Sequence, residues 1–158
     1  KPLIVFTPKS MLRNKAAVSA VEDFTTGTFE PVLPDTTVDP AKVRRVLLTT
    51  GKVYWDLVAR RKKLEAEDTA IVRVEQLYPL PSEQLQSVLD SYPDAELTWV
   101  QEEPQNQGAW SFMAMNFAVE VGRTLRVVAR PASASPATGS NATHKVEQEE
   151  LLSRAFEA

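Results

Sequence analysis

The sequence predicts an α/β fold: a doubly wound, mostly parallel sheet of about five strands with helices on both faces. Short apolar, β-branched runs alternate along the chain with longer segments whose apolar residues recur at helical spacing. Glycine and proline separate several of these segments, where strands and helices are expected to end. Because parallel strands need crossover connections, and right-handed crossovers cover both faces of the sheet, the alternation favours this architecture.

The first 42 residues are expected to lead into the main domain. Residues 3–6, Leu-Ile-Val-Phe, form an apolar run between Pro2 and Thr7-Pro8, which predicts a buried strand. Residues 10–24 have loose apolar spacing and predict a weak helix, with Ser10 as its cap. Residues 25–42 hold three prolines, one glycine and five threonines and predict a long connection. We therefore expect a lead-in at 1–42 and an α/β domain at 43–158.

The first complete strand-turn-helix unit begins at the apolar run 46–48. It continues through the turn Thr-Thr-Gly-Lys at 49–52 into an amphipathic helix of about four turns. Val53, Leu57 and Leu64 lie on one face of this helix. The same alternation predicts strands at 69–74, 97–100 and 125–129, and helices that start at Pro81-Ser82, end at Gly122, and span 145–156.

The carboxyl ends of these strands are where a doubly wound sheet is expected to bind ligands. The segments that follow the strands are "TPKS", "TTGK", "EQLYP", "QEEPQNQG" and "RPASASP". The fourth belongs to the stretch "WVQEEPQNQGAW" at 99–110, which combines carboxylates, amides and two tryptophans. This stretch is expected to lie at the functional edge of the sheet.

Composition excludes several classes of protein. A net charge of −3 and a pI near 5.3 do not favour binding to nucleic acid or anionic lipid. The chain has no cysteine, which fits a reducing, cytoplasmic location, and its single histidine, His144, excludes a multi-histidine metal site. No apolar run approaches the roughly 20 residues that span a bilayer. The start "KPLIVFTPKS" has no initiator Met and no signal-peptide layout, so we expect a piece of a longer polypeptide.

Familiar catalytic motifs are incomplete. "TTGK" lacks the frame of a phosphate-binding loop, and no dinucleotide-binding glycine motif occurs. Glu102 and Glu103 are adjacent and expected to diverge, unlike the facing carboxylates of a glycosidase. His144 with Ser140 or Ser153 could suggest acyl transfer, but no nucleophile elbow is present. We therefore expect no catalytic residue and no metal ligand in this segment.

Basic side chains suggest two interpretations. The group at 60–63, Arg-Arg-Lys-Lys, lies in the last turns of a helix, where cations complement the helix dipole. Lys9, Arg13 and Lys52 follow expected strand ends and, if they converge with a helix N-terminus, could hold an anionic ligand such as phosphate.

Six blocks carry a resemblance that covers nearly the whole chain. They are "LIVFTPKSMLR", "GKVYWDL", "AIVRVEQLYPLP", "WVQEEPQNQGAW", "RPASASPATG" and "HKVEQEEL", in this order. In order and spacing the chain resembles the C-terminal domain of the bacterial, thiamine-diphosphate-dependent 2-oxoglutarate dehydrogenase component, a transketolase-like family. The six blocks together are specific, whereas 25–42 and 111–125 carry little of the resemblance.

The resemblance implies a parent enzyme that oxidatively decarboxylates 2-oxoglutarate in the tricarboxylic acid cycle. Such an enzyme uses thiamine diphosphate and magnesium and passes the succinyl group to a lipoyl arm of the dihydrolipoyl succinyltransferase component. The family's cofactor motif, a GDG followed by asparagines, is absent here. This segment is therefore expected to contribute to a homodimer and to support the active site, with the cofactor bound elsewhere in the parent chain.

Some actinobacterial members of this family have an acetyl-CoA effector site that involves the same domain. By their position at strand ends and their chemistry, the candidate effector residues here are Lys9, Ser10, Arg13, Thr49, Lys52, Gln101 and Arg130.

The stretch 99–110 has a second, structural interpretation. Its amides and Pro104 could fix a turn while its tryptophans anchor a domain or dimer contact. The residues expected in this structural and interface role are Trp99, Glu102, Glu103, Asn106, Gln107, Trp110 and His144. The alternative to a domain of this enzyme is an autonomous α/β module that binds a ligand or subunit without catalysis.

Overall fold

The computed structural model describes residues 1–157 and divides into two compact units, Lys1–Glu30 and Pro31–Ala158. The first unit contains only short helices: η1 (Lys9–Met11), η2 (Lys15–Ala17) and α1 (Val21–Thr25), none with a buried residue.

Two expectations for the first unit are wrong. Residues 3–6 form no strand, and their side chains are exposed, up to 95% for Phe6. A lone strand has no neighbour to accept or donate its ladder hydrogen bonds, so the pattern alone could not produce one. The continuous weak helix is also absent, because Asn14 caps the short helix η2 by accepting a hydrogen bond from the Ala16 amide at 3.0 Å.

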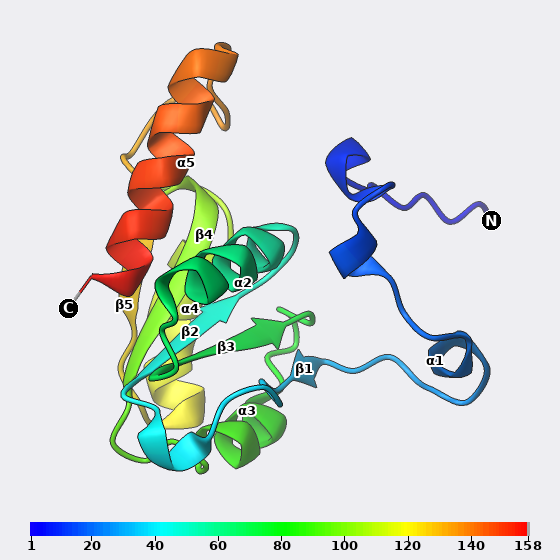
Figure 1. The fold of residues 1–158 in the computed structure, drawn as a ribbon, viewed down its shortest axis with the longest axis vertical. Coiled ribbons are helices and arrows are strands. Elements are labelled where there is room, and N and C mark those ends of the chain that lie inside the picture. The colour runs from blue at the N-terminus through cyan, green and yellow to red at the C-terminus, as the bar shows by residue number, and fades with distance from the viewer. Residues whose placement is uncertain (158) are drawn as a thin grey trace. The chain divides into compact units, whose positions relative to one another are not determined.

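The second unit contains a five-stranded sheet of order β1-β3-β2-β4-β5 (Figure 1). All neighbouring strands are parallel except β1, which runs antiparallel to β3 at one edge. The mostly parallel sheet is therefore confirmed, although its fifth strand lies within the expected connection rather than at residues 3–6. The strands are β1 (Val32–Leu33), β2 (Arg45–Thr49), β3 (Thr69–Val74), β4 (Glu96–Pro104) and β5 (Arg126–Arg130).

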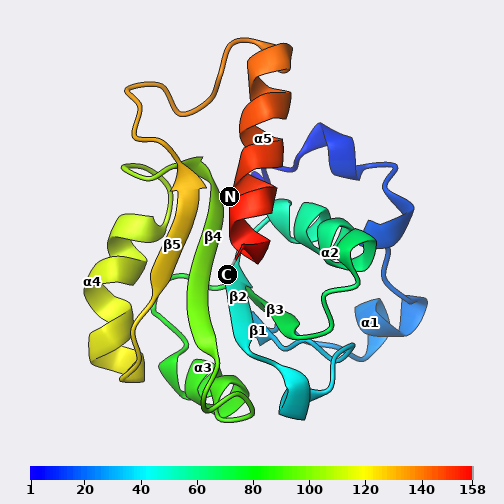
Figure 2. The same cartoon turned by 60° about the vertical axis from the view of Figure 1, so that its left-hand side comes forward.

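Helices cover both faces of this sheet, as the sequence predicts (Figure 2). The four helices are α2 (Val53–Leu64), α3 (Ser82–Leu89), α4 (Trp110–Val121) and α5 (Asn141–Phe156). α3 and α4 pack on one face and α2 and α5 on the other. A short helix, η3 (Pro40–Lys42), precedes β2.

Alternate residues of the central strands face the two layers. Leu48 and Trp99 pack with Phe117 of α4, whereas Leu47 packs on the opposite face with Leu57 of α2. This follows from the two-residue period of a strand and explains why consecutive residues of β2, at 46–48, are all apolar.

Two element boundaries differ from expectation. β4 continues through Pro104, so the first part of "QEEPQNQG" is strand rather than loop, and Gln105 donates its amide to the Arg130 carbonyl at 2.9 Å. α5 begins at Asn141, four residues before the expected start at 145. The reason is Ser140, whose hydroxyl caps the first turn by accepting from the Thr143 amide at 3.4 Å.

The basic group at 60–63 does more than complement the dipole of α2. Arg60 donates to Glu149 and Ser153 of α5, each at 2.6 Å. Arg61 forms an ion pair with Asp35 and donates to Thr37, on the segment between β1 and η3. Arg60 and Arg61 therefore tie α2 to two other elements, which their position in the sequence did not indicate.

Candidate functional site

The carboxyl edge of the sheet has a topological switch point between β2 and β4. From β2 the chain passes through α2 to β3 on one side, whereas β4 pairs with β2 on the other side. In doubly wound sheets this position commonly forms a ligand crevice. Thr49, Lys52 and the residues 101–103 all lie here.

Gln101 organises the edge of β4 from a buried position, with 2% of its surface exposed. Its Oε1 accepts hydrogen bonds from the Trp99 indole at 3.0 Å and the Trp110 amide at 2.8 Å. Its Nε2 donates to the carbonyls of Gln107 at 2.7 Å and Pro104 at 3.1 Å. The side-chain amide thus links β4, the following turn and the first turn of α4. An effector that contacted this amide would have to displace one of these partners.

The turn that Gln101 holds requires glycine at position 108. Gly108 has φ +66°, and a Cβ there would meet Gln101 Nε2 and Glu103 Cβ, both at 3.1 Å. Gly51 in the β2–α2 turn has a similar φ of +72° but open space around it. The two glycines therefore separate the cost of backbone strain from the cost of crowding.

Replacing each glycine by alanine is expected to give unequal losses of stability. Gly51→Ala should cost about 1–2 kcal/mol for the left-handed backbone alone. Gly108→Ala should cost at least about 1 kcal/mol more, because the new methyl group crowds Gln101 and Glu103. Urea unfolding of both variants measures the difference. Equal losses would show that the turn relaxes around the added methyl group.

Lys52 and Glu102 form an ion pair across the switch point, and both side chains are about one quarter exposed. Glu103 points the other way and is exposed, so the two adjacent carboxylates diverge as expected. The Thr49 hydroxyl donates to the Val100 carbonyl at 2.8 Å inside the sheet. Lys52 and Thr49 therefore already have partners within the chain.

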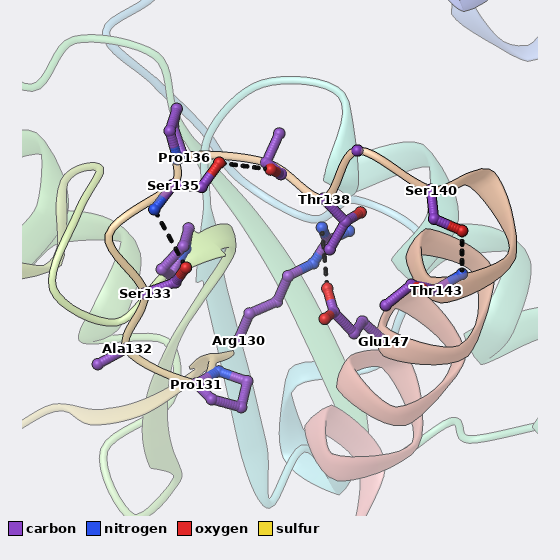
Figure 3. Close-up of a pocket in the computed structure, with 13 residues that line it drawn as sticks. Arg130, Pro131, Ala132, Ser133, Ser135, Pro136, Thr138, Ser140, Thr143 and Glu147 are labelled. Atoms are coloured by element: carbon purple, nitrogen blue, oxygen red, sulfur yellow. Dashed lines mark hydrogen bonds and ion pairs between the residues drawn. The ribbon is translucent and has the colours of Figure 1, made fainter.

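A separate cavity of about 450 Å³ lies between the end of β5, the loop 131–140 and the start of α5 (Figure 3). Arg130, only 7% exposed, extends along this cavity toward α5. Its guanidinium donates to Gln148 at 2.8 Å and His144 Nδ1 at 3.0 Å, and lies 3.5 Å from Glu147. Arg130 Nε and Thr138 Oγ1 are shielded from solvent and have no hydrogen-bond partner among the described residues.

The amides of the stretch 99–110 connect the two loops at this edge. The side chains of Asn106 and Gln107 donate hydrogen bonds to the Ser133 carbonyl at 3.0 and 2.8 Å. The backbone amide of Ser133 donates to Asn106 Oδ1 at 3.0 Å. Trp99 is fully buried and packs inside the domain, so it offers no surface for another domain or subunit. Trp110 is half-buried at the start of α4.

A mainly apolar cavity of about 390 Å³ adjoins the switch point. Trp99 and Gln101 line it together with Tyr78 and Phe112, whose rings lie edge to face at 6.2 Å. Tyr78 is 83% exposed. This surface combines an aromatic rim with few charges.

The structure groups some candidate effector residues and separates others. Thr49, Lys52 and Gln101 lie at the switch point, whereas Arg130 belongs to the cavity beside α5. Lys9, Ser10 and Arg13 belong to the first unit. The idea that they converge with Lys52 depended on a strand at residues 3–6, which the described chain does not contain.

Sequence reasoning missed Asp35, the most heavily bonded carboxylate of the second unit. It pairs with Arg61 and accepts the Ile71 amide at 2.8 Å and the Thr37 hydroxyl at 2.6 Å. Burial acts to raise the pKa of the Asp35 carboxyl, but hydrogen bonds from Thr37, Ile71 and Arg61 outweigh it and lower the pKa below 3.8. The available signal was the spacing Asp35-Thr36-Thr37, which is typical of an Asx turn.

The described residues contain no cluster of metal-binding side chains. Across residues 1–157, no group of three or more His, Cys, Asp or Glu side chains could hold a metal ion. None of the helices in that range is both long and apolar enough to cross a membrane. Fold and site thus define a doubly wound α/β domain whose polar side chains at the strand ends mostly bond within the chain.

Comparison with known proteins identifies the family. Residues 18–156 match the family model described as 2-oxoglutarate dehydrogenase C-terminal, and the chain belongs to this family. It is 50% identical to the 2-oxoglutarate dehydrogenase E1 component of Cupriavidus necator over 161 residues, covering 99% of this chain and 17% of that protein. It is 49% identical to the multifunctional 2-oxoglutarate metabolism enzyme of Mycobacterium sp. (strain JLS) over 165 residues, covering 99% and 13%. The chain therefore spans less than one fifth of these relatives.

Proposed function

We propose that this chain is the C-terminal domain of a thiamine-diphosphate-dependent 2-oxoglutarate dehydrogenase of the tricarboxylic acid cycle. The parent enzyme oxidatively decarboxylates 2-oxoglutarate and transfers the succinyl group to a lipoyl group. The observation that carries this proposal is about 50% identity to two such named enzymes across 99% of the chain. The partners are the rest of the same polypeptide, a second copy in a homodimer, and the dihydrolipoyl succinyltransferase component, in the cytoplasm.

Within that enzyme, the proposed role of this domain is support. Thiamine diphosphate and magnesium would bind elsewhere in the parent chain, where they supply the decarboxylation chemistry. The side chains at the switch point support this division, because Gln101, Thr49 and Lys52 are held by partners inside the domain. Glu103, Trp110, Tyr78 and Phe112 remain available for contacts with other parts of the enzyme.

A turnover assay of the full-length parent enzyme tests the proposed 2-oxoglutarate dehydrogenase activity. With thiamine diphosphate, Mg²⁺ and an artificial electron acceptor, the full-length parent enzyme should oxidise 2-oxoglutarate at least about 100-fold more efficiently than pyruvate. This ratio corresponds to a discrimination of about 2.7 kcal/mol. Omitting thiamine diphosphate is the control. A chain that prefers pyruvate, or that oxidises neither substrate, would refute the proposal.

We further propose that an anionic effector such as acetyl-CoA binds to Arg130, one of the candidate effector residues, in the cavity beside α5. The cavity beside Arg130 supports this, since its volume of about 450 Å³ lies in the usual range for ligand pockets. A small shift of the loop 131–140 would let a ligand oxygen reach Arg130 Nε and Thr138 Oγ1, which have no hydrogen-bond partner within residues 1–157. The backbone amides in the first turn of α5 also have no carbonyl partner within the helix, so they can donate hydrogen bonds to an anion.

Arg130→Lys is expected to weaken acetyl-CoA binding. Loss of a charge-assisted hydrogen bond costs about 1.5–3 kcal/mol, which corresponds to roughly 10- to 100-fold in Kd. Isothermal titration of the intact chain measures the effect. Lys145→Ala, on the exposed side of α5, should bind like the unmodified protein. If the unmodified chain does not bind acetyl-CoA, the effector proposal fails.

A further inference from the structure

The first unit exposes many large apolar side chains. None of its residues is buried. Exposed large apolar residues occur along its whole length, and contiguous exposed apolar surface usually marks a contact site. They are Leu3, Ile4, Val5, Phe6, Leu12, Val18, Val21, Phe24 and Phe29.

Residues 3–6 have the sequence of a strand but not the contacts of one. The run contains β-branched Ile4 and Val5 between Pro2 and Pro8. No backbone hydrogen bond within residues 1–157 involves these four residues. Backbone groups in an apolar run need partners if the run is to leave water, and a sheet supplies them most directly.

The pattern of the run indicates what kind of sheet would accept it. A strand with one face in water alternates apolar and polar residues, whereas all four residues of this run are apolar. Consecutive apolar residues place apolar side chains on both faces, as in the inner strands of a sheet covered by helices. The run therefore fits the interior of a covered sheet better than a flat apolar surface.

We propose that residues 3–6 form a strand in a sheet that belongs to the same polypeptide but lies outside these 158 residues. This inference rests on the proposed function, in which the chain is one domain of a longer enzyme. The relatives support this source, because the matched region makes up only 17% and 13% of their lengths. Pro2 and Pro8 limit the strand, since proline cannot donate to a ladder.

Charge adds a constraint on the accepting sheet. Lys1, Lys9, Arg13 and Lys15 precede the first acidic residue of the chain, Glu22. The loops that flank the accepting strands are therefore expected to be acidic.

Hydrogen–deuterium exchange on the intact enzyme tests the strand. The amides of residues 4–6 should exchange at least about 100-fold more slowly than in an unstructured peptide. Val5→Asp should abolish that protection, while Val146→Asp on α5 should leave it unchanged. Val146 is a matched control for Val5, because the two side chains are 67% and 68% exposed within this chain. If Val5→Asp prevents folding, Val5→Thr, which keeps the branched shape, should reduce the protection.

Three outcomes overturn parts of the proposal separately. Unprotected amides at 4–6 in an enzyme that oxidises 2-oxoglutarate overturn the strand alone. Protected amides in a protein with no such activity overturn the proposed function and leave the strand standing. A third test replaces Phe6 by a photo-crosslinking residue and mixes isotopically light and heavy copies of the enzyme in one dimer. Because the accepting sheet is proposed to lie in the same polypeptide, every crosslinked product should join two segments of the same isotope. Mixed products would assign the accepting sheet to the second copy and contradict the proposal.

Discussion

Asp35→Ala is expected to lower the free energy of unfolding by about 2–4 kcal/mol, because it leaves the partly buried Arg61 without its carboxylate. It also removes the acceptor for the Ile71 amide of β3 and for Thr37. The segment before η3 should then detach from α2 and from the sheet. Urea unfolding followed by circular dichroism measures the loss.

Asp94→Ala is the matched control for this substitution. Asp94 is exposed, so its replacement should change stability by less than about 0.5 kcal/mol. Similar losses for both variants would mean that the Asp35 network contributes little to folding.

The lowered pKa of Asp35 sets the pH dependence of the same network. A carboxyl group whose pKa is lower in the folded state stabilises the fold above its unfolded pKa. That stability is lost as pH falls through the folded value, which lies below 3.8. The stability gap between the unmodified chain and Asp35→Asn should therefore be full at pH 7 and narrow below about pH 5. A gap that widens in acid would contradict this direction of the pKa shift.

Gln101→Leu is expected to destabilise the domain by about 2–4 kcal/mol. Leucine has a volume similar to that of glutamine but cannot form the buried hydrogen bonds. The Trp99 indole, the Trp110 amide and the Gln107 carbonyl would all lose their partner. Amide exchange should rise in residues 103–110 before it rises elsewhere in the sheet.

Gln105→Leu provides the comparison, since Gln105 lies in the same turn but is exposed. It should change neither stability nor exchange at 103–110 by a comparable amount. If Gln101→Leu is as mild as this control, the turn is held by its backbone alone.

The parallel sheet could be predicted because its strands and helices carry local patterns that agree with one another. Leu47 and Leu48 lie in an uninterrupted apolar run, and Gly122 follows α4 in the left-handed conformation. These signals depend on a few neighbouring residues. The family resemblance was likewise visible in blocks of sequence and is confirmed by the match over 18–156.

The remaining features depend on residues that are distant in sequence. The strand β1 has only two residues, and its pairing of Val32 with Val74 joins segments that no local pattern connects. Asp35 and Arg61 are 26 positions apart, so their ion pair was not visible. Gln101 was identified, but as a ligand contact. Its hydrogen bonds to the turn became evident only once the chain had folded around it.

The most direct test of the account is the turnover of the intact enzyme carrying Glu102→Gln and Glu103→Gln together. Our central claim is that this domain supports the enzyme and does not perform its chemistry. It predicts that kcat for 2-oxoglutarate stays within about threefold, because a missing general acid or base would cost about 100-fold or more. A loss of that size, in a variant that keeps its stability and its dimer, would show that the carboxylates take part in catalysis and would contradict the claim.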